Sequence, residues 1–231
     1  IITIMIDTSG EGLHKRGYRA NANIAPIRET LAAALVYISR YRKNEVFCDP
    51  LCGSGTIAIE AAMLARNIAP GLNRKFAAQS FSQIPEKVWE DARENAKSRV
   101  IYNKPAIFAS DIDENAVLLT RENAKKAGVG TDIEVTRADI KDLSIEGDRG
   151  VIICNPPYGE RMSEIKEVEK LYREMGSKFL SLDGFRYYII SSVENFEELF
   201  GKKSDKNRKL YNGMLKCFLY QYFKRSTGGK R

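Results

Sequence analysis

Short apolar runs that alternate with helical stretches are the feature of this sequence that most restricts its fold. Strands that alternate with helices in this way form a parallel sheet with both faces covered. We therefore predict an α/β fold with a mostly parallel sheet and helices on both faces. The runs expected as strands are residues 46–48, 107–109, 133–136, 151–154 and 187–190.

The helices between these runs are predicted from apolar periodicity and from end signals. Pro26 is expected to open the first helix, and a second helix is expected to begin near Thr56. A third is predicted over 114–127, between a capping Asp113 and a terminating Gly128. The connection 67–105 is too long for a simple loop and predicts an extra helix after Pro85. The long last helix is expected to face inward through Ile165, Val168, Leu171, Met175, Phe179 and Leu182.

The two ends of the chain depart from this alternation. Residues 1–6 alternate in the manner of a strand and lead into a turn. Asn212-Gly213 lies between two strand-like runs, which predicts an antiparallel hairpin at one edge of the sheet. We expect residues 1–23 to be a strand and hairpin linker from an upstream domain, and residues 24–231 to form the main domain.

Charge and composition exclude several classes of protein. No stretch approaches 18 uncharged apolar residues, so no transmembrane helix is expected. Four scattered cysteines and one histidine fit neither a disulfide scaffold nor a multi-histidine zinc site, so we expect no metal and a cytoplasmic location. Residues 1–45 carry a net charge of +3 and residues 201–231 of +9. These basic ends fit either a polyanion-binding rim or a solvated surface with a basic tail.

A small polar residue follows each of the first four expected strands: Asp49, Asp111, Asp139 and Asn155. In an open α/β sheet, ligands bind outside the carboxyl ends of the strands. Parallel strands place all these ends at one edge of the sheet. The sequence therefore predicts a single crevice lined by three carboxylates and an amide.

A glycine-containing turn follows the first of these strands, at Asp49-Pro-Leu-Cys-Gly-Ser-Gly-Thr56. Its glycines allow the backbone to approach a ligand, and the next helix offers free N–H groups. The spacing also matches the dinucleotide fingerprint, which leaves an NAD-dependent dehydrogenase as an alternative. Against NAD, Asp111 lies far beyond the expected position of a ribose-binding acid, and an acid at the turn favours a ligand with an ammonium group.

The fourth strand runs into Asn155-Pro156-Pro157-Tyr158, the most specific signal in the chain. Two prolines restrict the backbone and predict a rigid loop. Such a loop can hold a planar base. Tyr158 would stack on the base, while the Asn155 side-chain oxygen and the Pro156 carbonyl would accept hydrogen bonds from its amino group.

Together, Asp49-Pro-Leu-Cys-Gly-Ser-Gly55 and Asn155-Pro-Pro-Tyr-Gly-Glu-Arg161 resemble the class I S-adenosylmethionine-dependent methyltransferases that act on exocyclic amino groups. With the opening Leu13-His-Lys-Arg-Gly-Tyr-Arg19, the chain resembles the catalytic domain of the THUMP-associated ribosomal RNA guanine (N-2) methyltransferases. The resemblance implies a Rossmann-like, seven-stranded, mostly parallel sheet with an antiparallel edge hairpin. It also implies large-subunit ribosomal RNA as a partner and an upstream THUMP domain that helps to bind it.

The resemblance also implies roles for individual residues. Cofactor-binding residues would be Asp49, Cys52, Gly53, Ser54, Gly55, Thr56, Asp111, Ile112, Asp139, Ile140 and Asn155. Catalytic residues would be Asn155, Pro156, Pro157 and Tyr158, and residues in contact with RNA phosphate would be Arg16, Arg19 and Arg161. The alternatives left open are transfer RNA guanine, DNA adenine or cytosine, a protein glutamine amide, and a non-catalytic RNA-binding module.

Overall fold

A seven-stranded sheet forms the centre of the computed structural model, which describes residues 2–19, 27–159 and 162–223. The strand order is β3-β2-β1-β4-β5-β7-β6; the first five strands are parallel, and β7 and β6 are antiparallel. The expected fold is confirmed, including the hairpin at Asn212-Gly213. The strands are β1 Val46–Asp49, β2 Ile107–Asp111, β3 Ile133–Arg137, β4 Gly150–Cys154, β5 Phe185–Ser191, β6 Lys206–Asn212 and β7 Leu215–Tyr222.

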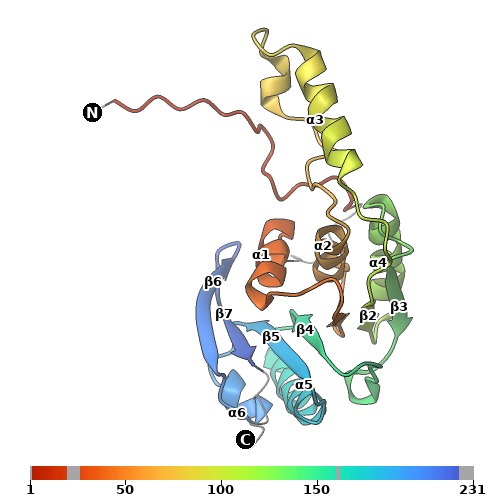
Figure 1. Cartoon of the computed structure of the whole chain (residues 1–231). Helices are drawn as coiled ribbons and strands as arrows, with labels where there is room; N and C mark the ends of the chain where they lie inside the picture. Colours follow the sequence, from red (N-terminus) through yellow and green to blue (C-terminus); the bar gives the residue numbers. More distant parts are fainter. Residues whose placement is uncertain (1, 20–26, 160–161, 224–231) are drawn as a thin grey trace, which may run out of the picture.

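Helices cover both faces of this sheet (Figure 1). One face carries α1 Glu29–Ser39, α2 Thr56–Ala65 and α4 Glu114–Lys126. The opposite face carries α5 Met162–Leu180 and α6 Phe196–Phe200. Two short 3-10 helices, η1 Ala77–Ser80 and η2 Ile140–Asp142, lie in connections. Asp113 caps α4 by accepting from the Asn115 N–H at 2.9 Å, as its sequence position predicts.

Each central strand contributes side chains to two separate apolar cores, because neighbouring residues point to opposite faces. Phe47 and Ile153 pack with α1, α2 and α4, while Cys48 and Ile152 pack with α5 and α6. All four of these side chains are buried. Burial of both faces explains why the strands read as continuous apolar runs in the sequence.

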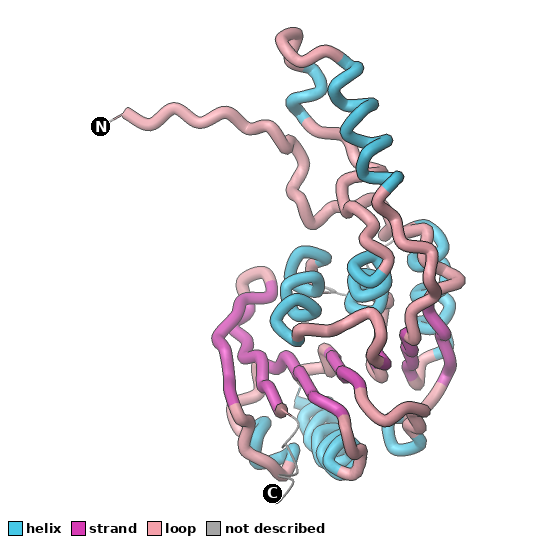
Figure 2. The backbone as a smooth tube through the Cα atoms, viewed as in Figure 1, coloured by secondary structure: helices cyan, strands magenta, loops and turns pink. Residues whose placement is uncertain are grey.

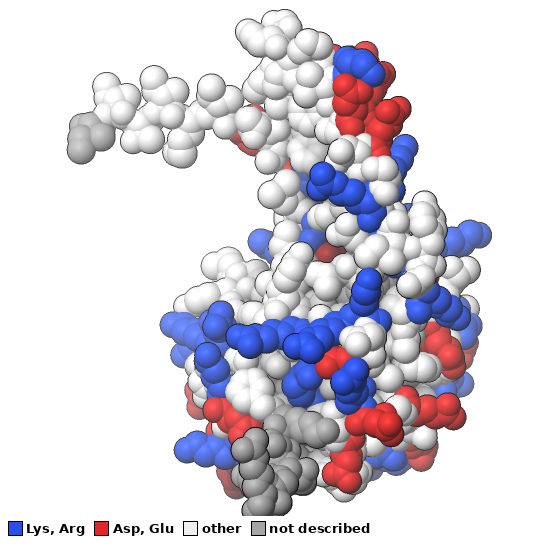
Figure 3. Space-filling view, viewed as in Figure 1, with Lys and Arg blue, Asp and Glu red and all other residues white. Residues whose placement is uncertain are grey.

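The segment 67–105, named here the arm, extends from the body between α2 and β2 (Figure 1). It contains the predicted extra helix, α3 Glu86–Ser98, none of whose residues is buried. Phe76 and Trp89 stack at 5.7 Å and hold α3 against the rest of the arm. Acidic side chains gather on the outer face of α3 (Figure 3).

Three predictions about local structure need correction. The predicted strand at the amino end is wrong, because residues 2–6 are exposed and form no ladder with any described strand; Figure 2 shows them as loop. The first helix begins at Glu29, and Pro26 lies outside the described residues. Ile165 is 45% exposed, so the inward face of α5 starts one turn later, at Val168.

We expect Gly176→Ala to destabilise the fold. A Cβ at Gly176 would lie 2.0 Å from the Phe200 carbonyl oxygen, so α5 and α6 would have to separate. In an isolated helix the same change stabilises by about 1 kcal/mol. Here overpacking against backbone outweighs that gain, and we expect a net loss of about 1–3 kcal/mol in urea denaturation. The control Ser177→Ala, on the exposed side of α5, should leave the midpoint unchanged or slightly raised; equal midpoints for the two variants would contradict the close packing.

Candidate active site

The strand order reverses direction between β1 and β4, and this position defines the candidate site. From β1 the chain proceeds to β2 and β3 on one side, whereas β4 and β5 lie on the other. In open α/β sheets the crevice at such a reversal is where ligands bind. The structure brings Asp49, Asp111 and Asn155 to this carboxyl edge, immediately at or after the ends of β1, β2 and β4. Asp139 lies in the turn after β3, where it caps η2.

The glycine loop, residues 52–55, is held in place by the neighbouring strand and by α4. The Cys52 N–H donates to the Ser110 carbonyl at 2.9 Å, and the Thr120 hydroxyl donates to the Gly53 carbonyl at 3.0 Å. Gly55 has a φ of +78°, and a Cβ there would lie 2.6 Å from the Thr120 methyl group. The loop therefore needs glycine at position 55 for two reasons: the backbone is left-handed there, and the Thr120 side chain leaves no space for a Cβ atom.

Gly53 differs from Gly55 in what surrounds it. Its φ of +53° is also left-handed, but a Cβ at this position would meet no atom within 4 Å. The Gly53 N–H donates to the Asp111 carboxylate at 3.0 Å, which ties the end of β2 to the loop. The second Asp111 oxygen accepts from the Asp113 N–H at 3.1 Å. Open space beside an anchored backbone is what close approach of a ligand requires.

Asp49 is the most unusual group of the site. Its side chain is buried, and its Oδ1 atom has no hydrogen-bond partner. Burial raises the pKa of Asp49 well above its usual range, and the nearby Asp111 charge raises it further. An unpaired buried carboxyl oxygen is unfavourable unless a ligand supplies a positive group or a donor. The amino acid end of S-adenosylmethionine and its sulfonium provide such charge, so the residue fits that cofactor.

Two further predicted cofactor residues differ in exposure. Ile112 is 57% exposed beside Asp111, which leaves its side chain accessible for an apolar ring. Ile140 is buried in the core beneath α5, so its side chain is not accessible at the edge.

Asp139 accepts from the Lys141 N–H at 3.1 Å and pairs with the Lys141 ammonium at 3.0 Å. The hydrogen bond and charge of Lys141 hold the pKa of Asp139 below its usual range.

The Asn-Pro-Pro-Tyr loop, residues 155–158, follows β4 at the same edge. The Tyr158 hydroxyl donates to Asn155 Oδ1, and the Cys217 thiol lies 3.8 Å from that hydroxyl. The Tyr158 ring is half-buried and packs against the core under α1 and α2. In this structure the ring therefore points inward and orients the Asn155 amide, whereas the sequence pattern predicted that it would stack on the base. Asn155 Oδ1 retains a second lone pair for a substrate amino group.

A buried hydrogen bond from α5 also supports this loop, and the sequence pattern did not reveal it. The hydroxyl of Tyr172, on α5, donates to the Pro157 carbonyl at 2.9 Å and lies 2.9 Å from the Ser191 hydroxyl at the end of β5. Ser191 in turn accepts from the Val193 N–H at 3.1 Å. Tyr172 follows the inward Val168 by one helical turn, and this spacing could have identified it as buried.

The two described arginines predicted to contact RNA lie in ion pairs within the fold. Arg16 donates to Glu60 at 2.8 Å with a side chain only 10% exposed. Arg19 donates to the Thr56 hydroxyl at 2.9 Å and lies 3.7 Å from Glu29. These contacts attach residues 16–19 to α1 and α2, which argues against the phosphate role expected for both. Arg161 lies outside the described residues.

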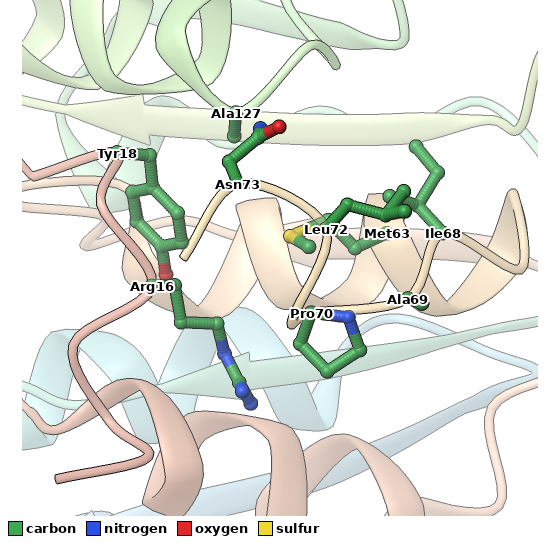
Figure 4. A pocket seen from close by; sticks show the side chains of 9 residues that line it. All are labelled: Arg16, Tyr18, Met63, Ile68, Ala69, Pro70, Leu72, Asn73 and Ala127. Carbon is green, nitrogen blue, oxygen red and sulfur yellow. The ribbon is translucent and has the colours of Figure 1, made fainter. Parts of the chain in front are cut away.

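A cavity of about 20 Å³ lies between the segment that precedes α1 and the end of α2, away from this edge, with room for a water molecule (Figure 4). Its lining residues are Arg16, Tyr18, Met63, Ile68, Ala69, Pro70, Leu72, Asn73 and Ala127.

Across the described ranges, no three His, Cys, Asp or Glu side chains are grouped to hold a metal ion. In the same part of the chain, no helix is long and apolar enough to cross a membrane.

A parallel sheet with a reversal in strand order, a glycine loop after β1, an acid at the end of β2 and an Asn-Pro-Pro-Tyr loop after β4 together define a class I methyltransferase. Comparisons with known proteins agree. The model of the family described as "RMKL-like, methyltransferase domain" matches residues 16–221, and the chain belongs to this family. It is therefore an S-adenosylmethionine-dependent methyltransferase domain, which decides against the dehydrogenase alternative.

Individual relatives give the extent of the similarity. The chain is 49% identical over 221 residues to the "Putative RNA methyltransferase YpsC" of Bacillus subtilis, covering 95% of this chain and 57% of that protein. It is 38% identical to the "Ribosomal RNA large subunit methyltransferase K/L" of Shewanella amazonensis, covering all of this chain and 34% of that protein. The chain thus spans only part of the length of these relatives.

Solved structures confirm the fold. The putative methyltransferase SMU.472, whose crystal structure contains SAH, superposes with a TM-score of 0.91 at 40% identity, covering 96% of this chain and 58% of that chain. A possible methylase from Clostridium difficile 630 gives a TM-score of 0.92 at 46% identity, covering 97% and 59%. SAH is the product left by S-adenosylmethionine after methyl transfer, in agreement with the cofactor expected here.

We expect Asp49→Asn to stabilise the free protein and to weaken cofactor binding. Because the folded-state pKa of Asp49 is raised, the unfolded chain loses this proton first as pH rises, and stability falls. Asparagine does not ionise, so this loss of stability disappears. At neutral pH we therefore expect the free energy of unfolding, measured with denaturant, to rise by about 1–3 kcal/mol. The positively charged cofactor loses its partner, and its Kd should rise about tenfold or more in calorimetry. Asp113→Asn, which preserves a capping oxygen, should change neither quantity; a parent-like cofactor Kd in Asp49→Asn would contradict the role.

We expect Tyr172→Phe to slow methyl transfer without weakening cofactor binding. The variant keeps the buried ring but leaves the Pro157 carbonyl without its donor. Small displacements of groups that orient a substrate lower rates strongly, so kcat should fall about tenfold. The matched control is Tyr187→Phe, whose hydroxyl donates to the Leu182 carbonyl at 2.8 Å away from the site. Both variants should lose about 1 kcal/mol of stability, whereas equal kcat values would show that the Tyr172 contact is structural only.

Proposed function

We propose that this chain transfers the methyl group of S-adenosylmethionine to the exocyclic N-2 amino group of a guanine in large-subunit ribosomal RNA. The position of Asn155 supports this most directly. Its amide oxygen lies at the carboxyl end of β4, next to the strand that ends at the unpaired carboxyl of Asp49. A site of this kind holds a positively charged methyl donor on one side and an amino group on the other.

The proposed chemistry needs no covalent nucleophile. When bound, S-adenosylmethionine would supply an electrophilic methyl group to the guanine amino nitrogen. As the new carbon–nitrogen bond forms, the carbon–sulfur bond breaks, S-adenosylhomocysteine leaves and the amino group loses one proton to solvent. That nitrogen is a weak nucleophile because its lone pair is delocalised into the ring. Asn155 Oδ1 and the Pro156 carbonyl would accept its two hydrogens, which localises the lone pair and directs it toward the methyl group.

The cysteines of the chain fit this direct transfer better than a covalent mechanism. Burial raises the pKa of Cys48, Cys52, Cys154 and Cys217, so each is a thiol rather than a thiolate at neutral pH. Methyl transfer through a cysteine adduct requires a thiolate. The site therefore suits a nitrogen target that reacts without prior covalent activation.

Two observations favour a nucleic acid as the substrate, and the first of them favours ribosomal RNA in particular. The names of the relatives from Bacillus subtilis and Shewanella amazonensis refer to RNA and to large-subunit ribosomal RNA. The hairpin formed by β6 and β7 carries basic residues and no acid, as a surface that meets phosphate should. We propose that an upstream THUMP-type domain of a longer protein supplies further RNA affinity, and that the reaction takes place in the cytoplasm, where free buried cysteines remain reduced.

We expect Asn155→Ala to abolish most transfer while cofactor binding persists. The assay measures transfer of labelled methyl to large-subunit ribosomal RNA transcribed in vitro, followed by nucleoside identification. Loss of the oriented acceptor should lower kcat about a hundredfold, with the cofactor Kd within about threefold of the parent. Asn103→Ala, at an exposed position before β2, is the matched control. A near-parent rate in Asn155→Ala would contradict the role of the amide.

The same assay distinguishes the other candidate substrates. N2-methylguanosine in the digest of the ribosomal RNA is the expected product. Label on transfer RNA, on DNA adenine or cytosine, or on a glutamine amide, with none on ribosomal RNA, would replace the proposed substrate. Cofactor binding with transfer to none of these would indicate a non-catalytic module.

A further inference from the structure

The hairpin of β6 and β7 reaches beyond the carboxyl edge of the sheet. Its neighbour β5 ends at Ser191, which pairs with Phe218, and Lys209 lies opposite Phe218, so residues 210–217 extend past the last strand position of β5. At about 3.3 Å per residue, the turn lies roughly 10 Å beyond that end. The parallel strands place the candidate site at this same edge. The hairpin therefore forms one wall of the region where a substrate must enter.

Contacts join this hairpin directly to the Asn-Pro-Pro-Tyr loop. The Cys217 thiol lies 3.8 Å from the Tyr158 hydroxyl, and Asn212 also interacts with that hydroxyl. Tyr158 in turn donates to Asn155 Oδ1. Cys217 and Asn212 lie on the α1 side of the hairpin, so these contacts place the hairpin turn next to the loop, with the opposite face of the hairpin reached by passing around that turn. A nucleotide next to the target base would therefore lie close to the hairpin turn.

One face of the hairpin carries alternating lysine and aromatic side chains. In the strand register Lys209 lies opposite Phe218, and Tyr211 lies opposite Lys216. The Lys209 ammonium lies 5.5 Å from the Tyr211 ring centre, and the Lys216 ammonium lies 5.3 Å from that of Phe218. The two types of side chain thus form a compact surface of four residues, named here the lysine–aromatic face.

This face is accessible to solvent although it contains large apolar groups. Tyr211 is 56% exposed, and Met214 at the turn is 99% exposed. Residues 206–222 include Lys206, Arg208, Lys209 and Lys216 but no Asp or Glu. Figure 3 shows Lys and Arg side chains gathered over the edge of the molecule where β6 lies. The charge is complementary to a polyanion, and it contrasts with the acidic outer face of α3.

We propose that the lysine–aromatic face binds the single-stranded RNA that flanks the methylated guanine. Tyr211 stacks on an unpaired base, and Lys209 and Lys216 contact its phosphates, which is how single strands are commonly bound. A guanine whose amino group must reach Asn155 has to leave its base pair, so its neighbours are accessible as single strand. This inference rests on the proposed function and adds to it the conformation of the substrate and the surface that holds it.

The test compares a hairpin double variant with a chemically matched double variant elsewhere. Tyr211→Ala combined with Lys216→Gln removes one ring and one charge from the face. Tyr102→Ala combined with Lys87→Gln makes the same changes in the arm, at side chains that are likewise exposed. Methyl transfer to large-subunit ribosomal RNA gives KM and kcat, and fluorescence anisotropy with a single-stranded oligonucleotide gives a direct Kd.

We expect the hairpin variant to raise the KM for RNA and the oligonucleotide Kd about tenfold, as loss of one stacked base does. Its cofactor Kd and kcat at saturating RNA should stay within about twofold of the parent. The salt dependence of log K should become shallower by about 0.7 for each phosphate that the variant no longer neutralises. The arm variant should match the parent in all of these quantities.

Two results would overturn the inference. One is a hairpin variant with the same KM and Kd as the arm variant. The other is self-association of the hairpin variant with unchanged RNA affinity, which would mean that the lysines protect an edge strand from pairing. Failure of the proposed function has a different signature, because the parent chain itself would then transfer no methyl to RNA; oligonucleotide binding would still test the hairpin.

Discussion

The parallel pairing of β1 with β4 is the constraint on which the site depends. Cys48 lies beside Ile152 in this pairing, which fixes the positions of the two loops that follow. It joins two strands that are separated by about a hundred residues in the sequence and sets the reversal in strand order. Without it, Asp49 and Asn155 would not share an edge, and the proposed donor and acceptor of the methyl group could not face each other.

The rigidity of that edge comes from contacts made by neighbouring elements rather than by the loops themselves. Ser110 and Thr120 hold the glycine loop from β2 and α4, while Tyr172 and Ser191 support the Asn-Pro-Pro-Tyr loop from α5 and β5. The loops carry the proposed chemistry, and packed helices and strands determine their positions. This division lets a backbone with left-handed glycines present a fixed surface to a ligand.

One group of the candidate site is unfavourable for folding of the free protein. The buried Asp49 oxygen has no partner, although a hydrogen-bonded or apolar residue there would be more stable. Such groups are expected where a ligand completes the structure, because binding then supplies the missing interaction. The hairpin has a related unfavourable feature at the surface, because the large side chains of Tyr211 and Met214 are exposed to water beside the same edge.

The sequence by itself determined the α/β alternation, the edge hairpin, the cap of α4 and the polar residues at the strand ends. These features depend on local periodicity and on turn residues, which act over a few positions. Only the tertiary structure decided that Arg16 and Arg19 lie in ion pairs, that Tyr158 points inward, that Ile140 is buried and that Tyr172 supports Pro157. It also showed that residues 2–6 form no strand. Each of these outcomes depends on which distant segments pack together, because burial and pairing are properties of the assembled sheet and not of any short stretch of chain.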